Sequence, residues 1–121
     1  MSPESAVEVH DLGDSITVVS ASGEHDLATA PQLDQALTRI EEGGTIVILD
    51  LTAATFIDSS IITTAIRHAQ LREQLLIVAP HYGQPRRTLD LVEAFKVLEL
   101  FENRDDALRA ATARERGGQP A

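Results

Sequence analysis

The chain reads, at residues 45–51, Thr45-Ile46-Val47-Ile48-Leu49-Asp50-Leu51. This stretch is almost continuously apolar, is rich in β-branched residues and shows no alternation between apolar and polar positions. A strand with such a pattern is covered on both faces, which is typical of the centre of a parallel sheet. The stretch therefore predicts a central strand in an α/β fold.

The residues before this strand predict a hairpin and then a helix. Two segments rich in Val, Ile and Thr, residues 6–12 and 15–22, flank Gly13-Asp14 and read as strands joined by a tight turn. Thr29 then opens a segment with apolar residues at helical spacing, which Gly43-Gly44 ends. Strand, helix and central strand together form a βαβ unit.

The residues after the central strand continue the alternation. Helical spacing recurs over residues 62–69 and 86–95, and residues 75–80 read as a buried strand that a proline stops. Residues 97–101 predict a short edge strand, with continuation of the preceding helix as the competing interpretation. Asn103 is placed to cap a last helix.

Length and composition indicate one domain with one core. The chain has 121 residues, of which 43% are hydrophobic, and no segment resembles a linker. We expect an α/β fold with a mixed, mostly parallel central sheet of four to five strands, about four helices and an N-terminal hairpin. The predicted domain spans residues 1–115, and residues 116–121 are predicted to form a flexible C-terminal tail.

Composition also argues against several functions. Because the chain has no cysteine, neither a disulfide framework nor a thiolate zinc site is available. The net charge of −9 disfavours nucleic-acid binding and electrostatic membrane binding. The first five residues carry no cation and precede no long apolar run, so we expect no signal peptide, no membrane insertion and a cytoplasmic location.

The charge is distributed unevenly along the chain. Up to Ile66 the sequence contains eleven Asp and Glu residues, and Arg39 is its only Lys or Arg. An acidic first half predicts a basic surface on a partner, although a solvated acidic face is the commoner explanation.

Polar residues follow two of the predicted strands. Because the carboxyl ends of parallel strands share one rim, Gly23-Glu24-His25-Asp26 and residues 55–60 should lie close together. The second segment leads into a helix that begins near Ser59, where free N–H groups and the helix dipole favour an anion. A phosphate on Ser59 or Ser60 would fit there. The competing interpretation is that Asp58 or Ser59 is an ordinary N-cap.

Four segments carry the most distinctive motifs of the chain. In order they are Gly23-Glu24-His25-Asp26-Leu27-Ala28-Thr29-Ala30, Ile48-Leu49-Asp50-Leu51, Phe56-Ile57-Asp58-Ser59-Ser60, and Ala79-Pro80 with Arg87-Thr88-Leu89-Asp90-Leu91. Taken together, they resemble the STAS domain, and within it the anti-sigma factor antagonists of bacterial serine-phosphorylation switches. The first segment is similar to the family's G-E-x-D-x-x-T-A stretch, the second to its central strand and the third to its D-S-S/T loop. The fourth corresponds to its fourth strand and following helix.

The resemblance implies a binding protein and not an enzyme, with no cofactor and no metal. The unphosphorylated chain would bind an anti-sigma factor that is also a GHKL-type serine kinase, and so release a sigma factor. Phosphorylation of Ser60, with Ser59 as the alternative, would end this association, and a PP2C-type phosphatase would restore it. A homodimer is compatible with this scheme. The residues implied in partner binding are Glu24, Asp26, Thr29, Asp58, Ser59, Ile61 and Ile62.

One position departs from the family pattern. Ile61 stands where the family usually has glycine, and it would place a bulky branched side chain where a kinase approaches. This departure raises an alternative function, that of a phosphorylation-independent STAS adaptor subunit in a stress-sensing particle or a lipid-transport ATPase. Thr63 and Thr64 are weaker acceptor candidates, because threonines within helices commonly bond to the preceding turn.

Two further interpretations have less support. A small hydrolase would use Ser60 with His25 and Asp26, but neighbouring residues on an extended segment point in opposite directions, so His25 is predicted to lie on the surface. A serine-reactive phosphonate would test this class. A continuous strand from Phe56 to Ala65 would leave no crossover helix. Arg86-Arg87 is expected to be solvated or paired with acidic residues, and the four histidines show no metal-ligand spacing.

Overall fold

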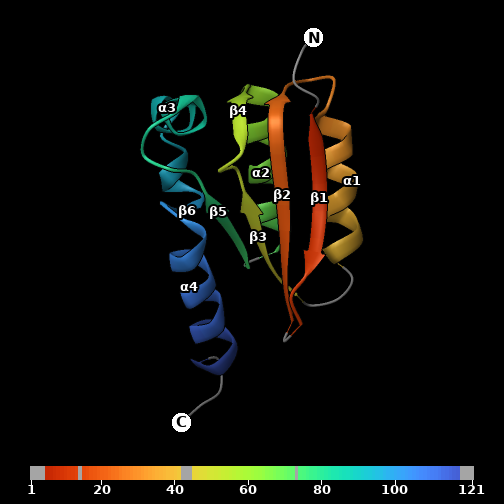
Figure 1. Cartoon of the computed structure of the whole chain (residues 1–121), viewed down its shortest axis with the longest axis vertical. Coiled ribbons are helices and arrows are strands. Elements are labelled where there is room, and N and C mark those ends of the chain that lie inside the picture. Colours follow the sequence, from red (N-terminus) through yellow and green to blue (C-terminus); the bar gives the residue numbers. More distant parts are fainter. Residues whose placement is uncertain (1–4, 14, 42–44, 73, 118–121) are drawn as a thin grey trace.

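The computed structural model describes residues 5–13, 15–41, 45–72 and 74–117. Figure 1 shows a sheet with α1 and α2 behind the strands and α4 on the opposite side. The elements in chain order are β1 (Ala6–Asp11), β2 (Ile16–His25), α1 (Ala30–Glu41), β3 (Ile46–Asp50), β4 (Ala54–Ile57), α2 (Ser59–Leu71), β5 (Leu75–Val78), α3 (Gln84–Leu91), the 3₁₀ helix η1 (Ala94–Lys96), β6 (Glu99–Phe101) and α4 (Arg104–Gly117).

The strand order is β1-β2-β3-β5-β6, and β4 pairs with β2 beside this path. β1 runs antiparallel to β2, from Ala6 opposite Ser22 to Asp11 opposite Thr17. The other pairings of the described strands are parallel. The predicted fold class and N-terminal hairpin are confirmed, although Asp14 of the predicted turn lies outside the described residues.

The central strand β3 is buried over its whole length. Because successive side chains of a strand point to opposite faces, Val47 and Leu49 enter the core beneath α1 and α2, while Ile46 and Ile48 enter the core beneath α4. Burial on both faces explains why this stretch shows no polar alternation.

Asp50 ends β3 and is only 4% exposed. Its Oδ1 accepts hydrogen bonds from the N–H and the hydroxyl of Thr52, at 2.9 and 2.5 Å, and its Oδ2 accepts one from Nε of Arg104 at 2.8 Å. A buried carboxylate is costly unless it is paired. Here the pairing ties the end of β3 to the start of α4.

Residues 54–57 form β4, where the sequence predicts a loop. The first part of β2 pairs with β3, and its last three residues pair with β4. The register shifts between Gly23 and Glu24, and Gly23 has a φ of 81°, which glycine adopts readily. β4 adds a sixth strand to the four or five predicted, and it is too short for periodicity to reveal. Since α2 begins at Ser59, the alternative of a continuous strand from Phe56 to Ala65 is wrong.

After β5, the helix is shorter than the sequence predicts. α3 ends at Leu91 and not at Phe95, because Glu93 adopts left-handed backbone with a φ of 54°, after which η1 begins. Residues 99–101 form β6. The predicted edge strand is therefore confirmed, and continuation of the helix is wrong.

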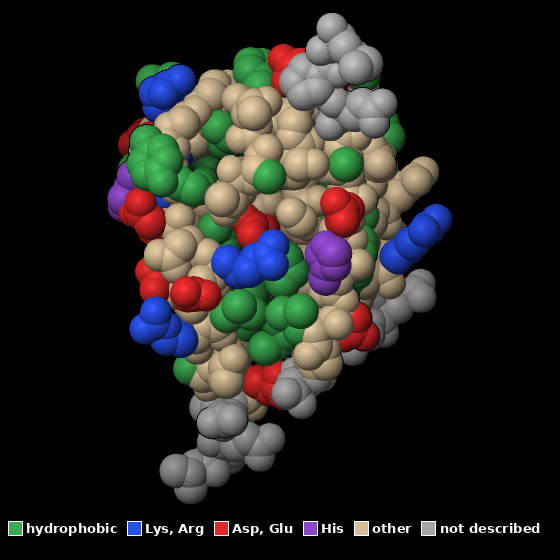
Figure 2. Space-filling view, viewed as in Figure 1, with side chains coloured by type: hydrophobic (Ala, Val, Ile, Leu, Met, Phe, Trp, Pro, Cys, Tyr) green, Lys and Arg blue, Asp and Glu red, His purple; other side chains and the backbone are tan. Residues whose placement is uncertain are grey.

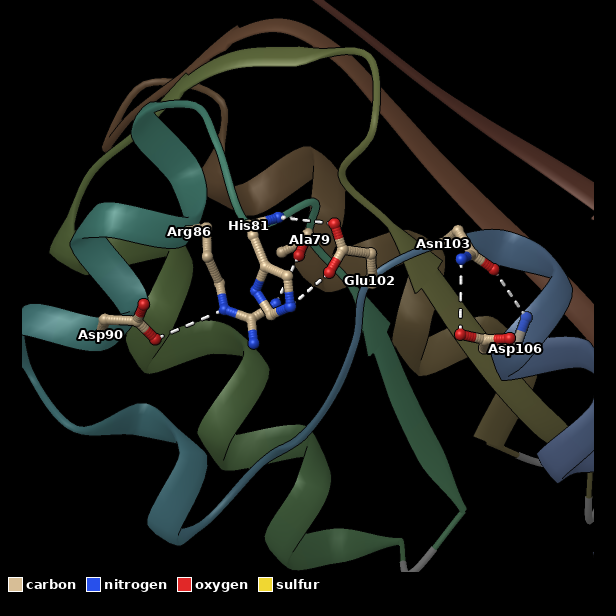
Figure 3. A network of polar contacts seen from close by, with 7 residues as sticks. All are labelled: Ala79, His81, Arg86, Asp90, Glu102, Asn103 and Asp106. Atoms are coloured by element: carbon tan, nitrogen blue, oxygen red, sulfur yellow. Dashed lines mark hydrogen bonds and ion pairs between the residues drawn. The ribbon is translucent and has the colours of Figure 1, made fainter.

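Polar contacts fasten α3 and the turn before α4 to the end of β5 (Figure 3). Nη1 of Arg86 donates to the carbonyl of Ala79 at 2.5 Å, and its Nε pairs with Asp90 at 3.4 Å. The N–H of His81 donates to Glu102 at 3.4 Å. Because the side chain of Arg86 is only 13% exposed, the expectation that it is solvated is wrong, whereas the other expectation, pairing with an acidic residue, is met by Asp90 on the same helix.

Asn103 caps α4 as predicted, because its Oδ1 accepts the N–H of Asp106 at 2.8 Å. The helix runs to Gly117, two residues past the predicted domain boundary, and residues 118–121 of the predicted tail lie outside the described residues. Gly43-Gly44, predicted to end the first helix, also lie outside them. Among the helices that the structure describes, none has the length and apolar character needed to cross a membrane.

Leu49→Ala should lower the free energy of unfolding by about 3 kcal/mol, because it leaves a cavity in the core beneath α1 and α2. Leu91→Ala is the matched control: Leu91 is 83% exposed, so its loss should change stability by less than about 0.5 kcal/mol. Urea denaturation followed by circular dichroism measures both. Equal effects of the two variants would contradict the assigned core.

Candidate functional site

Two loops meet where β2 and β4 end. Residues 26–29 join β2 to α1, and Asp58 alone joins β4 to α2. The N–H of Leu27 donates to Oδ2 of Asp58 at 3.2 Å. The prediction that these two loops lie together is confirmed.

Asp58 is the N-cap of α2, as one of the competing interpretations proposed. Its backbone is extended, with φ −116° and ψ −175°. Oδ1 accepts hydrogen bonds from the N–H groups of Ser60 and Ile61, at 2.9 and 3.4 Å, and from the hydroxyl of Ser60. One carboxylate therefore caps the helix and also holds the neighbouring loop through Leu27.

The environment of Asp58 favours its charged form. Burial by itself would raise the pKa of the carboxyl, but the hydrogen bonds from the Ser60 hydroxyl and from the N–H groups of Ile61, Ser60 and Leu27 lower that pKa below its ordinary value. A carboxylate can only accept, so the Ser60 hydroxyl donates its proton to Asp58. The remaining lone pairs of that hydroxyl oxygen are directed away from the carboxylate.

The two candidate serines differ in their surroundings. Ser59 is exposed at the first position of α2, whereas Ser60 is partly buried and borders a groove between α1 and α2. The residues that line this α1–α2 groove are Leu27, Ala30, Pro31, Asp34, Ser60, Thr63, Thr64 and Arg67. The Ser60 hydroxyl is therefore the one that a hydrogen bond orients and that also lies beside the groove.

Polar contacts cross the α1–α2 groove. Oδ1 of Asp34 on α1 accepts a hydrogen bond from Nη2 of Arg67 at 2.6 Å and lies 2.7 Å from Nε2 of the buried His68, both on α2. The hydrogen bonds from His68 and then Arg67 lower the pKa of Asp34 below its ordinary value. Sequence reasoning missed these contacts because the partners are 33 and 34 residues apart.

The prediction that His25 lies on the surface is wrong, because this side chain is 1% exposed. Its Nε2 lies 2.9 Å from the carbonyl oxygen of Ser22, which can only accept, so we place the ring proton there. Nδ1 lies 3.1 Å from Oγ1 of Thr29, so this nitrogen accepts the hydroxyl proton, and the same hydroxyl oxygen accepts the N–H of Asp26 at 3.0 Å. The ring thus stabilises its own loop, while Ser60 is bonded to Asp58.

The side chains of Ile61 and Ile62 belong to the core, with 1% and 4% exposure. The expectations that they contact a partner, and that Ile61 presents bulk to an approaching kinase, are therefore wrong: the first turn of α2 directs both side chains inward. The hydroxyl of Thr64 donates to the Ser60 carbonyl at 2.9 Å, as expected for a threonine in a helix. Thr63 is exposed in the α1–α2 groove.

The other residues implied in partner binding do reach the surface. Glu24, Asp26 and Ser59 are exposed, and Thr29 and Asp58 are partly buried. We call Glu24, Asp26 and Asp58 the acidic rim. On the face of the molecule drawn in Figure 2, Lys and Arg side chains are interspersed with Asp and Glu. Within the described residues, no group of three or more His, Asp or Glu side chains could hold a metal ion.

Comparison with protein families places the STAS domain on residues 8–107 of the chain. The sequence matches none of the curated proteins.

Several solved structures are similar to the chain. An anti-sigma factor antagonist from Mycobacterium paratuberculosis is 30% identical, with 93% of this chain and 99% of that chain covered and a TM-score of 0.83. A putative anti-sigma factor antagonist from Thermotoga maritima is 13% identical, with 88% of this chain and 94% of that chain covered and a TM-score of 0.74. The phosphorylated form of the Bacillus cell fate determinant SpoIIAA is 14% identical, with 87% of this chain and 98% of that chain covered and a TM-score of 0.65. The last two similarities concern the fold alone.

Asp58→Ala should lower the free energy of unfolding by about 1 kcal/mol near neutral pH, because α2 loses its cap. The pKa of Asp58 is depressed in the folded state, so its stabilisation is present above the ordinary Asp pKa of about 4 and is lost as the pH falls through the lower folded value. The stability difference between wild type and Asp58→Ala should therefore shrink in acid, as urea denaturation across pH would measure.

Asp58→Asn is the control for this experiment. Asparagine caps helices about as well as aspartate but carries no charge, so this variant should keep most of the stability near neutral pH. A difference between wild type and Asp58→Ala that stays constant into strong acid would contradict the role of the charged carboxylate.

Proposed function

This chain belongs to the STAS domain family, and we propose that it acts within that family as an anti-sigma factor antagonist. In this role the unphosphorylated chain binds an anti-sigma factor of the GHKL serine-kinase type through the acidic rim and the α1–α2 groove. The observation that carries the proposal is the hydroxyl of Ser60, which Asp58 holds beside that groove. The similarity to the Mycobacterium paratuberculosis antagonist, 30% identical over 93% of this chain, supports the same role.

Ser60 is the proposed phosphoacceptor. Its proton already points to Asp58, so a lone pair of the hydroxyl oxygen is free to attack the γ-phosphorus of ATP while the bond from that phosphorus to the departing ADP breaks, and the carboxylate is placed to take the proton. Ser59 is the alternative acceptor, but among the described contacts no hydrogen bond fixes its hydroxyl. The proposed chemistry belongs to the kinase, and this chain is its substrate.

A phosphate on Ser60 would change the site by charge and by volume. It adds about −1.5 to −2 charges beside the Asp58 carboxylate and breaks the hydrogen bond between the two side chains. The N-terminus of α2 tolerates an anion, so the helix survives the modification. The phosphate occupies the partner's place in the α1–α2 groove, and its repulsion of the Asp58 carboxylate disturbs the contact with the Leu27 loop. Both effects displace the partner, and a PP2C-type phosphatase resets the site.

The buried position of Ile61 bears on the alternative function, a phosphorylation-independent adaptor subunit. That alternative rested on a bulky side chain at the docking surface. Since the Ile61 side chain is only 1% exposed, it leaves the approach to Ser60 free. We therefore keep the adaptor as an outcome of the experiment below and not as a second proposal.

The first experiment is phosphopeptide mapping of the purified chain after incubation with Mg-ATP and lysate of its source cells. We expect phosphate on Ser60, retained in Ser59→Ala and lost in Ser60→Ala. Phosphate that is retained in Ser60→Ala and lost in Ser59→Ala would move the switch to Ser59. As a positive control, a GHKL-type anti-sigma kinase in the same lysate should phosphorylate its own antagonist. If that control succeeds and neither Ser59 nor Ser60 of this chain carries phosphate, the result would contradict the switch and favour the adaptor.

Binding to the captured anti-sigma factor should weaken as salt is raised. The acidic rim would pair with a basic partner surface, and salt screens such exposed charges over a Debye length of about 8 Å at physiological ionic strength. Surface plasmon resonance should show the loss mainly in the association rate. Asp26→Asn should reduce this salt dependence, whereas Asp105→Asn, an exposed position on α4, should not. An affinity that is independent of salt would contradict the electrostatic part of the proposal.

A further inference from the structure

Gln84, the first residue of α3, makes two hydrogen bonds to one residue of β4. Its Oε1 accepts the N–H of Ile57 at 2.8 Å, and its Nε2 donates to the carbonyl of Ile57 at 2.9 Å. A side-chain amide has one donor and one acceptor side by side, so it pairs with the strand as a neighbouring peptide would. We call this pair of bonds the Gln84 clamp.

The Gln84 clamp lies on the edge of β4 that faces away from β2. β2 is the strand to which β4 pairs in the described sheet, and the N–H and carbonyl of one strand residue point to the same side. Ile57 is 1% exposed, so without Gln84 its two backbone groups would be buried and unsatisfied at this edge.

The side chain at position 84 is specific for this task. Asparagine is one methylene shorter, methionine has the length but forms no such bonds, and glutamate can accept the Ile57 N–H but cannot donate to its carbonyl. The start of α3 is itself held in place, because Arg86 binds the carbonyl of Ala79 at the end of β5 (Figure 3). Gln84 therefore joins β4 to a fixed part of the molecule.

We infer that Gln84 is a positioning residue for the site: by holding both backbone groups of Ile57, it sets where the Asp58 carboxylate stands and, through it, the Ser60 hydroxyl and the Leu27 N–H. β4 has only four residues, and Asp58 is the only residue between it and α2. A displacement of Ile57 is therefore passed directly to Asp58. This role rests on the proposed function in one respect, that Asp58 and Ser60 belong to the partner surface.

Gln84→Met in the full chain tests the inference by hydrogen exchange and carboxyl titration in NMR. The amides of Ser60 and Ile61, which donate to Asp58, should exchange about tenfold faster than in wild type. The pKa of Asp58 should rise toward its ordinary value, because its donors are less well placed. Amides of the β1–β2 hairpin should be unaffected, which separates positioning from a general loss of stability.

Two further variants make the result decisive. Gln70→Met, at an exposed position on α2, should leave every readout unchanged. Gln84→Glu keeps the acceptor for the Ile57 N–H but sets a carboxylate oxygen against the Ile57 carbonyl, so it should speed the same two exchanges; it decides the question if the methionine variant does not fold. Unchanged exchange at Ser60 and Ile61, or equally faster exchange in the hairpin, would overturn the positioning role. This test uses the free chain, without kinase or partner. A negative result would therefore overturn the role of Gln84 alone, and the proposed function would still be tested separately by the phosphorylation experiment.

Discussion

The arrangement of the whole site depends on β2 having two neighbours on one of its edges. The strand pairs with β3 over residues 16–20 and with β4 over residues 23–25. The change of neighbour occurs at Gly23, whose positive φ and register shift bend the ladder. Because of it, the loop that leaves β2 and the loop that leaves β4 end side by side. In this arrangement the N–H of Leu27 lies 3.2 Å from Oδ2 of Asp58.

That proximity allows one carboxylate to serve three purposes. Asp58 caps α2, holds the backbone of Leu27 and fixes the hydroxyl of Ser60. Such an arrangement is sensitive to charge, because a second anion placed at Ser60 competes for the same donors and repels the carboxylate. The proposed phosphate switch would need this kind of local sensitivity on a rigid scaffold. The Gln84 clamp supplies part of that rigidity from α3, an element outside the two loops.

Sequence reasoning was most accurate where the pattern is local. The buried strand at residues 45–51, the N-terminal hairpin and the cap at Asn103 follow from short-range spacing and were found where they were expected. The errors concern side chains whose burial depends on distant partners. His25 reads as a polar surface residue, but its loop encloses the ring. Arg86 reads as part of a basic spot, but it reaches a carbonyl at the end of β5.

The sequence by itself determined the α/β fold, the placing of the two loops at one rim and the capped start of α2, because hydrophobic periodicity and capping residues act over a few positions. Only the tertiary structure decided that residues 54–57 form a strand, that Ile61 points inward and that Gln84 closes the edge of β4. Each of these depends on contacts between residues far apart in the chain: Gln84 and Ile57 are separated by 27 positions. No local pattern records such a contact, since its partners come together only when the core of the sheet has formed.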